Sequence, residues 1–278
     1  MPADYERTRP PAISAHRGGS EGAPPGTYQA YREALSAGAD YVEIDVRRAA
    51  DGALVVSHPA RLGPFRRRLD RLGYDRLCAV AGYEVPRVAE VLPLLAGRAG
   101  LHLDVQDAGS AVAAAELALD HLQPADIIAT TRDPQVAREL GHRFPVLGVG
   151  VTVGGDAAET VRFAARRALR PGPAGSGPSR LDPVTAAGAS WAALHHRQAE
   201  ALARQCRERG IRTLVWTVSS DRALGHWLGC PAVDVLVTDR PGRAVALRNS
   251  ASPAAWPGHA ARPDRPGGPP GSAPGPAR

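Results

Sequence analysis

The sequence predicts an α/β fold, a (β/α)8 TIM barrel followed by a disordered C-terminal tail. Short apolar runs, typical of buried strands, alternate with helical segments from residue 13 to residue 248. The alternation yields eight principal β-then-α units, the number that closes a barrel of this class. Several apolar runs stop at a charged or aromatic residue, and such barrels carry their functional groups at those strand ends.

The first four units span residues 13 to about 143. Strands are expected at 13–15, 42–46, 101–105 and 127–130, with a short additional strand at 54–56. Helices are expected at 27–37, 88–95 and 111–121. The fourth helix should begin after Asp133 and Pro134, because aspartate is a favoured N-cap and proline suits the first helical position.

The last four units follow the same pattern. Their strands are expected at 146–153, 190–194, 213–217 and 233–238, and their helices at 157–169, 197–209, 222–228 and 241–248. Gly210 is placed to end the second of these helices, and residues 171–178 form a loop rich in Gly and Pro. An open doubly wound sheet is the alternative, but residues 18–22 are a poor version of its phosphate-binding turn.

Composition divides the chain into an N-terminal extension (1–11), the barrel (12–248) and a tail rich in Pro, Gly and Ala (249–278). The first residues are polar and no run approaches 18 apolar residues, so we expect a cytoplasmic protein without a transmembrane segment. The three cysteines are widely spaced and match no disulfide framework.

The net charge is +6, and every basic residue apart from histidine is arginine. Aromatic and basic residues are not interleaved as in nucleic-acid modules, so no nucleic-acid partner is expected. We expect the partner to be a small-molecule substrate. The composition does not decide whether the protein contacts lipid or what its oligomeric state is.

Two histidines and three carboxylates stand at the ends of early strands. Glu43 and Asp45 are two residues apart and therefore point to the same side of a strand, and Asp104 ends the next principal strand. Carboxylate oxygens are the ligands that hard divalent cations prefer. His16 and His58 can exchange protons near neutral pH. The set indicates metal-assisted phosphoryl-transfer chemistry.

The order of these and other motifs resembles the glycerophosphodiester phosphodiesterase family, within the phosphatidylinositol-phosphodiesterase-like barrel superfamily. The residues that carry the resemblance are His16-Arg17-Gly18, Thr27, Gly38-Ala39-Asp40, Glu43-x-Asp45-Val46, Asp51-Gly52, Val55-Val56-x-His58, Val85-Pro86, Leu103-Asp104, Val215-Trp216-Thr217-Val218, Val233-Asp234 and Thr238-Asp239-x-Pro241. The resemblance implies a metal-dependent phosphodiesterase that hydrolyses a glycerophosphodiester to glycerol 3-phosphate and an alcohol.

The resemblance also implies roles for individual residues. His16 and His58 would be the catalytic acid–base pair, without a decision on which is the acid. The divalent metal, Mg2+ or Ca2+, would be held by Glu43, Asp45 and Asp104, the last replacing the family's more usual glutamate. Arg17 would contact the substrate phosphate, with a structural salt bridge as the alternative.

Three further side chains are placed by their strands. Trp216 and His195 end the seventh and sixth strands, where they are candidates for the substrate pocket. The indole of Trp216 could form an apolar wall against an alcohol or choline group. His102 alternates with Leu101 and Leu103 and is expected to face the helix layer.

The chain departs from the family at four positions. Pro25, Gly26, Pro59 and Gln106 stand where Glu, Asn, Asp and Lys are usual. These losses motivate two alternatives: a phospholipase D-like or lysophospholipase D-like enzyme of the same superfamily, and a non-catalytic phosphodiester-binding barrel. Which head group is released stays undecided.

An arginine-rich segment follows His58. It contains Arg61, Arg66, Arg67, Arg68 and Arg71. The simplest interpretation is a solvated loop. The functional alternative is that these arginines attract an anionic substrate and replace the lysine missing at position 106.

Overall fold

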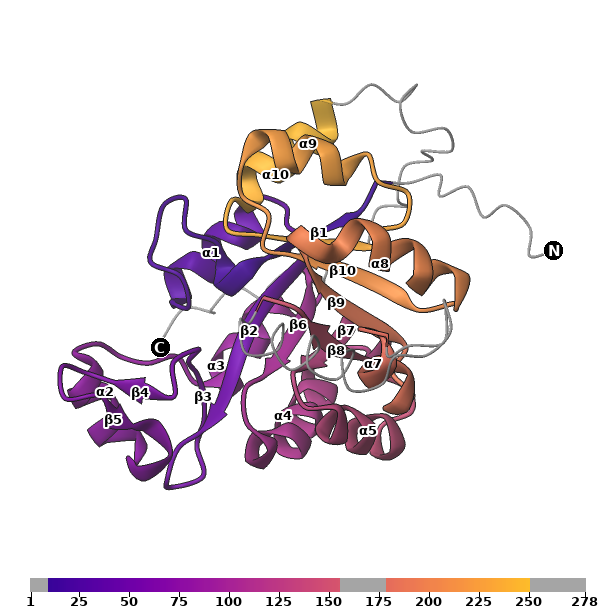
Figure 1. Cartoon of the computed structure of the whole chain (residues 1–278). Helices are drawn as coiled ribbons and strands as arrows, with labels where there is room; N and C mark the ends of the chain where they lie inside the picture. The colour runs from indigo at the N-terminus through magenta and orange to yellow at the C-terminus, as the bar shows by residue number, and fades with distance from the viewer. Residues whose placement is uncertain (1–9, 156–178, 251–278) are drawn as a thin grey trace, which may run out of the picture.

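A computed structural model describes residues 10–155 and 179–250, and over these residues it is a closed barrel surrounded by helices (Figure 1). Eight parallel strands form the described barrel. In barrel order they are β1 (Ala12–Ala15), β2 (Tyr41–Arg48), β6 (Gly100–Val105), β7 (Ile127–Thr131), β8 (Gly148–Val153), β9 (Trp191–His195), β10 (Arg212–Trp216) and β11 (Val235–Thr238). The predicted fold class is confirmed.

Closure of the sheet excludes the open alternative. Strand β1 pairs in parallel with β11 on one side and with β2 on the other, where Ser14 faces Tyr41 and Ala15 faces Val42. The short strand β3 (Leu54–Val56) pairs antiparallel with the end of β2. The carboxyl ends of all eight parallel strands therefore meet at one rim of the barrel.

The helices cover the outside of the barrel (Figure 1). They are α1 (Tyr28–Ser36), α3 (Val88–Leu95), α4 (Ala108–His121), α5 (Pro134–Arg143), α7 (Asp182–Ala186), α8 (His196–Glu208), α9 (Asp221–Leu228) and α10 (Pro241–Ser250). All but α7 were predicted, and Asp133 caps α5 by accepting a hydrogen bond from the Gln135 amide. Helix α10 includes two residues assigned to the tail.

The predicted helix 157–169, the loop 171–178 and the rest of the tail lie outside the described residues. None of the described helices is both long and apolar enough to cross a membrane.

Large and small side chains fill the barrel below the rim. Trp191 projects inward together with Ile128 and Leu214. Two glycines of β8 make room for it: a Cβ on Gly148 would lie 2.6 Å from the indole nitrogen of Trp191, and one on Gly150 would lie 2.9 Å from its Cβ. The amino-terminal half of the barrel is thus packed with apolar groups, which leaves the polar side chains at the other end.

The arginine-rich segment expected to be a loop is folded. It contains the two-stranded hairpin β4 (Arg61–Leu62) and β5 (Arg67–Arg68) and the helix α2 (Tyr74–Ala81). Leu62, Leu69, Leu72 and Leu77 form part of a small separate core beneath it. This unit lies beside the rim end of β2, away from the barrel core (Figure 1).

Candidate active site

Strands β2 and β6 bring the three predicted carboxylates together. Glu43 and Asp45 point to the barrel interior from β2, and Asp104 is paired directly with Asp45 across the sheet. One carboxylate oxygen from each of the three lies within 4.8 Å of the others. Glu43 and Asp45 are only 3% and 1% exposed. This is the one acidic group of metal-site spacing in the described part of the chain.

The carboxylates repel one another and are poorly hydrated. Burial, and then the charges of Asp45 and Asp104, raise the pKa of Glu43 well above its usual range. Burial and the nearby Asp104 raise the pKa of Asp45 to about 7. A bound divalent cation would offset both causes, because it replaces the lost hydration and neutralises the repulsion. Three clustered oxygen donors fit a hard cation such as Mg2+ or Ca2+.

Neutral hydrogen-bond donors bind oxygens of two of these carboxylates. The amide nitrogen of Gln106 donates to Asp45 Oδ1 at 2.7 Å and to Asp104 Oδ2 at 2.5 Å. Thr130 Oγ1 donates to Asp104 Oδ1 at 2.8 Å. These contacts orient the carboxylates as second-layer partners orient metal ligands.

The His-Arg-Gly motif forms a sharp turn, η1 (His16–Gly18), at the rim end of β1. Gly18 has φ +81°, and a Cβ there would lie 2.8 Å from the carbonyl carbon of Ala30, so the turn requires glycine. The turn aims Arg17 at the carboxylates: its backbone amide donates to Glu43 Oε2 at 2.5 Å, and its Nε lies 2.9 Å from Asp45 Oδ2.

His16 is held by a residue that received no role from the sequence. Its Nδ1 lies 2.6 Å from Asp239 Oδ1, at the rim end of β11. Ser219 Oγ donates to the other Asp239 oxygen at 2.8 Å. The hydrogen bond from His16 is the main cause that keeps the pKa of Asp239 below its usual range. With a carboxylate on Nδ1, this nitrogen carries the proton.

His58 lines the same cavity and follows β3 after one intervening residue. Protein atoms around the ring, and then the positive charge of Arg17, lower the pKa of His58 to about 4. The imidazole is therefore neutral at physiological pH. Arg47 fixes this segment, because its Nη2 donates to the His58 carbonyl oxygen at 2.8 Å and its Nη1 to the Gln106 carbonyl oxygen at 3.3 Å.

His102 faces the barrel interior, so the expectation that it faces the helix layer was wrong. Its ring nitrogens lie 3.3 Å from Ser14 Oγ and 3.0 Å from Thr130 Oγ1. Residues two apart on a strand share a face, so His102 had to follow Asp104 inward. Leu101 and Leu103 belong to the core between barrel and helices.

Trp216 lies at the mouth of the cavity, between two other side chains. Its indole nitrogen donates to the Ala193 carbonyl oxygen at 3.1 Å, and the His195 ring meets it edge-on at 4.9 Å between centroids. The guanidinium carbon of Arg132 lies 5.3 Å from the centre of the Trp216 ring. Arg132 directly follows β7 but was not predicted as a site residue, since arginine at a strand end is by itself a weak signal.

Seven of the eight predicted site residues line one cavity of about 60 Å3. They are His16, Arg17, Glu43, Asp45, His58, Asp104 and Trp216. His195 does not line this cavity, and its Nδ1 accepts a hydrogen bond from the Arg197 amide of α8 at 3.4 Å. A buried water needs roughly 10–15 Å3, so the cavity suits an ion and a few small groups.

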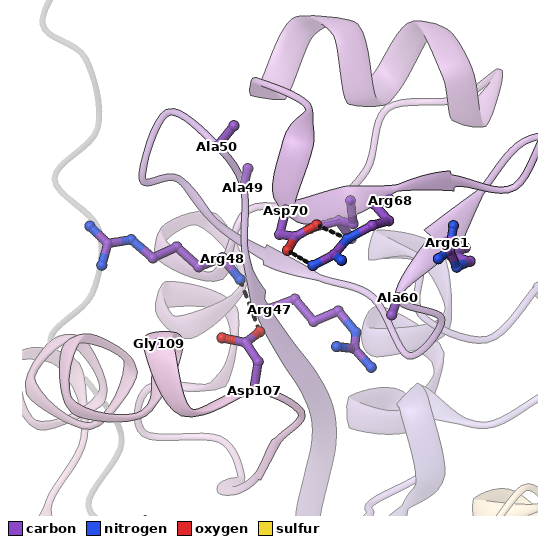
Figure 2. A pocket seen from close by; sticks show the side chains of 11 residues that line it. Arg47, Arg48, Ala49, Ala50, Ala60, Arg61, Arg68, Asp70, Asp107 and Gly109 are labelled. Carbon is purple, nitrogen blue, oxygen red and sulfur yellow. Dashed lines mark hydrogen bonds and ion pairs between the residues drawn. The ribbon is translucent and has the colours of Figure 1, made fainter.

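A second cavity, of about 570 Å3, lies between the hairpin and the end of β2 (Figure 2). Arg47, Arg61 and Arg68 border it with Asp70 and Asp107. Figure 2 shows Arg68 paired with Asp70 and Arg48 pointing away. The carboxylates of the first cavity do not border this one.

Residues 16–76 match the family described as the glycerophosphoryl diester phosphodiesterase family. Over 52 residues the chain is 52% identical to "Probable glycerophosphodiester phosphodiesterase 1" of Mycobacterium tuberculosis (strain CDC 1551 / Oshkosh). This match covers 19% of the chain and 19% of the relative, so the chain spans about a fifth of that relative's length in the alignment.

Solved structures are similar over much more of the chain. A glycerophosphodiester phosphodiesterase from Thermotoga maritima superposes with a TM-score of 0.67 at 19% identity, covering 85% of this chain and 98% of that one. An Oleispira antarctica phosphodiesterase in complex with its product sn-glycerol-3-phosphate gives 0.66 at 17% identity, covering 87% and 98%. At these identities the likeness establishes the fold. The resemblance indicated by the motifs is confirmed, in sequence over residues 16–76 and in fold over most of the chain.

Proposed function

We propose, from this resemblance, that the chain is a metal-dependent hydrolase that cleaves glycerophosphodiesters to glycerol 3-phosphate and an alcohol. The observation that carries the proposal is the single cavity in which three carboxylates, two histidines and Arg17 converge. Paired imidazoles flanking a hard-cation site match the needs of phosphodiester hydrolysis, which are proton transfer at two oxygens and compensation of negative charge.

Glu43, Asp45 and Asp104 would hold the divalent metal, Mg2+ or Ca2+. When bound, the metal supplies positive charge that offsets the charge building up on the phosphoryl oxygens. Gln106 and Thr130 keep two of these carboxylates turned toward the site. Arg17 remains a candidate for phosphate contact, although its Nε lies against Asp45.

The two histidines are given different roles by their surroundings. His58, with its lowered pKa, is neutral and can accept the proton of the attacking oxygen. His16 can donate a proton to the leaving alkoxide, because Asp239 compensates the charge of its protonated ring. Trp216 and His195 would border the alcohol group outside the small cavity.

Asp239→Asn is expected to lower kcat by about 10- to 100-fold. The amide cannot compensate the charge that His16 carries as a proton donor, so proton transfer to the leaving alkoxide is less well supported. Steady-state kinetics check this, and the metal concentration needed for activity should stay the same. Asp239→Glu, which keeps a carboxylate, should lose less than Asp239→Asn. Wild-type kcat in Asp239→Asn would contradict the positioning role.

The direct test of the function is turnover. Purified protein with Mg2+ or Ca2+ should release glycerol 3-phosphate from glycerophosphocholine, glycerophosphoethanolamine or glycerophosphoglycerol, and EDTA should stop the release. Lysophospholipids are assayed in parallel, because cleavage of these alone would favour the lipid alternative. Binding of these diesters without turnover, under any divalent metal, would favour the non-catalytic barrel.

A further inference from the structure

We propose that Arg132 binds the phosphate of the substrate and supplies the positive charge that the chain lacks at Gln106. This inference rests on the proposed function. It assigns a phosphate-oxygen subsite to the rim end of β7, in the cavity that His58 also lines.

Gln106 cannot take over the role of a lysine. Its side-chain amide has two N–H donors, and both are engaged, one by Asp45 and one by Asp104. The amide also carries no charge. Its contacts organise the carboxylates and leave no donor for a phosphate oxygen.

Arg17 is already committed to the carboxylates. Its Nε pairs with the nearly fully buried Asp45 at 2.9 Å, and its backbone amide is bound by Glu43. The guanidinium therefore offsets part of the negative charge of the three acids. A dianionic product or an anionic diester brings further negative charge that this arginine does not balance.

Arg132 has the charge that the other two positions do not provide. Within residues 10–155 and 179–250, its guanidinium has one hydrogen bond, from Nη1 to the Gly154 carbonyl oxygen at 3.3 Å, and a neutral acceptor leaves the charge in place. The guanidinium also lies against the face of Trp216. Its charge counteracts part of the rise in pKa that burial causes at Asp104. Arg132 lines the same cavity as the acids and histidines.

Position and shape suit a phosphate at this point. The cavity of about 60 Å3 has room for the metal but not for a whole diester, so part of the substrate must extend beyond it. Arg132 lines this cavity and is also exposed, so it can reach a phosphate at the boundary. A guanidinium can bind two phosphate oxygens with two parallel N–H donors. The contacts with Gly154 and Trp216 hold the side chain in advance of binding.

The hairpin arginines are not the source of this charge. Arg61 and Arg68 border the second cavity (Figure 2), and Arg68 is paired with Asp70. None of the five arginines of that segment lines the carboxylate cavity.

The test measures binding and turnover separately. Calorimetry of the Ca2+-loaded protein with glycerol 3-phosphate should give a dissociation constant that rises on the order of 10- to 100-fold in Arg132→Met, the effect of losing a charged hydrogen bond. Arg132→Lys should lose less. Ca2+ binding without glycerol 3-phosphate should not weaken in Arg132→Met, because the substitution removes a positive charge that repels the cation near the three carboxylates.

A second-site rescue makes the test specific. Adding Gln106→Lys to Arg132→Met should return much of the lost affinity, because it restores a cation on the neighbouring strand. Arg138→Met is the matched control: this exposed arginine of α5 donates to the Ala186 carbonyl oxygen and does not line the carboxylate cavity, so the variant should bind glycerol 3-phosphate like wild type. Unchanged affinity in Arg132→Met would overturn the proposal. If wild type binds glycerol 3-phosphate through Arg132 but hydrolyses nothing, the proposed function fails and this subsite stands.

Discussion

Replacing His58 or His16 with alanine is expected to lower kcat for glycerophosphodiester hydrolysis by at least about 100-fold, the scale of general acid–base catalysis. His58 is neutral because its pKa is lowered to about 4, so it is available as a base throughout the physiological range. His16 is bound by Asp239 at 2.6 Å and is the acid of the proposed mechanism. In that mechanism each loss removes one of the two proton transfers.

Steady-state kinetics at saturating metal check this expectation, with thermal unfolding as the measure of the fold. Both histidines lie at the rim and outside the apolar core, so the unfolding midpoint should change little. His142→Ala, at an exposed position near the end of α5, is the matched control. A variant that keeps near wild-type kcat would remove that histidine from the mechanism.

Asp45→Asn should raise the metal concentration needed for half-maximal activity by at least about tenfold, since even indirect partners of a metal ligand contribute this much. The substitution deletes one of three clustered charges while it preserves shape. Titration of activity with Mg2+ and Ca2+ after EDTA treatment measures the effect. Asp120→Asn, an exposed position on α4, is the control.

Metal binding by the wild-type protein should also depend on pH. Without metal, the pKa of Asp45 is raised to about 7, so below this pH the metal must displace a proton. The dissociation constant for metal should therefore rise as pH falls below about 7, by up to about tenfold per unit for one displaced proton. The same dependence in Asp45→Asn would show that another group is responsible.

Local patterns in the sequence were sufficient for the barrel and for most of its site. Strand and helix periods repeat over a few residues, so they identified α3 at residues 88–95 and the Asp133-Pro134 start of α5. The spacing of Glu43 and Asp45 determined that they share a face. Barrel topology then implied that strand ends meet, which grouped Asp104 and the two histidines with them.

Two predictions were wrong or missing where the short apolar patterns were ambiguous. In β6 both faces are buried, so alternation alone does not tell which face is interior, and His102 was assigned to the wrong one. The segment after His58 has few apolar residues among its arginines, so its helix α2 and small core were missed.

The sequence by itself determined the element order, the resemblance to a family and the chemical types at the strand ends. Only the tertiary structure decided which of these groups touch. Asp239 meets His16 across 223 positions of sequence because β11 closes the barrel on β1. The side-chain amide of Gln106 donates to both Asp45 and Asp104 because the register between β6 and β2 places these two acids side by side. Such contacts depend on strand register and ring closure, which are properties of the whole barrel and leave no local periodic signal.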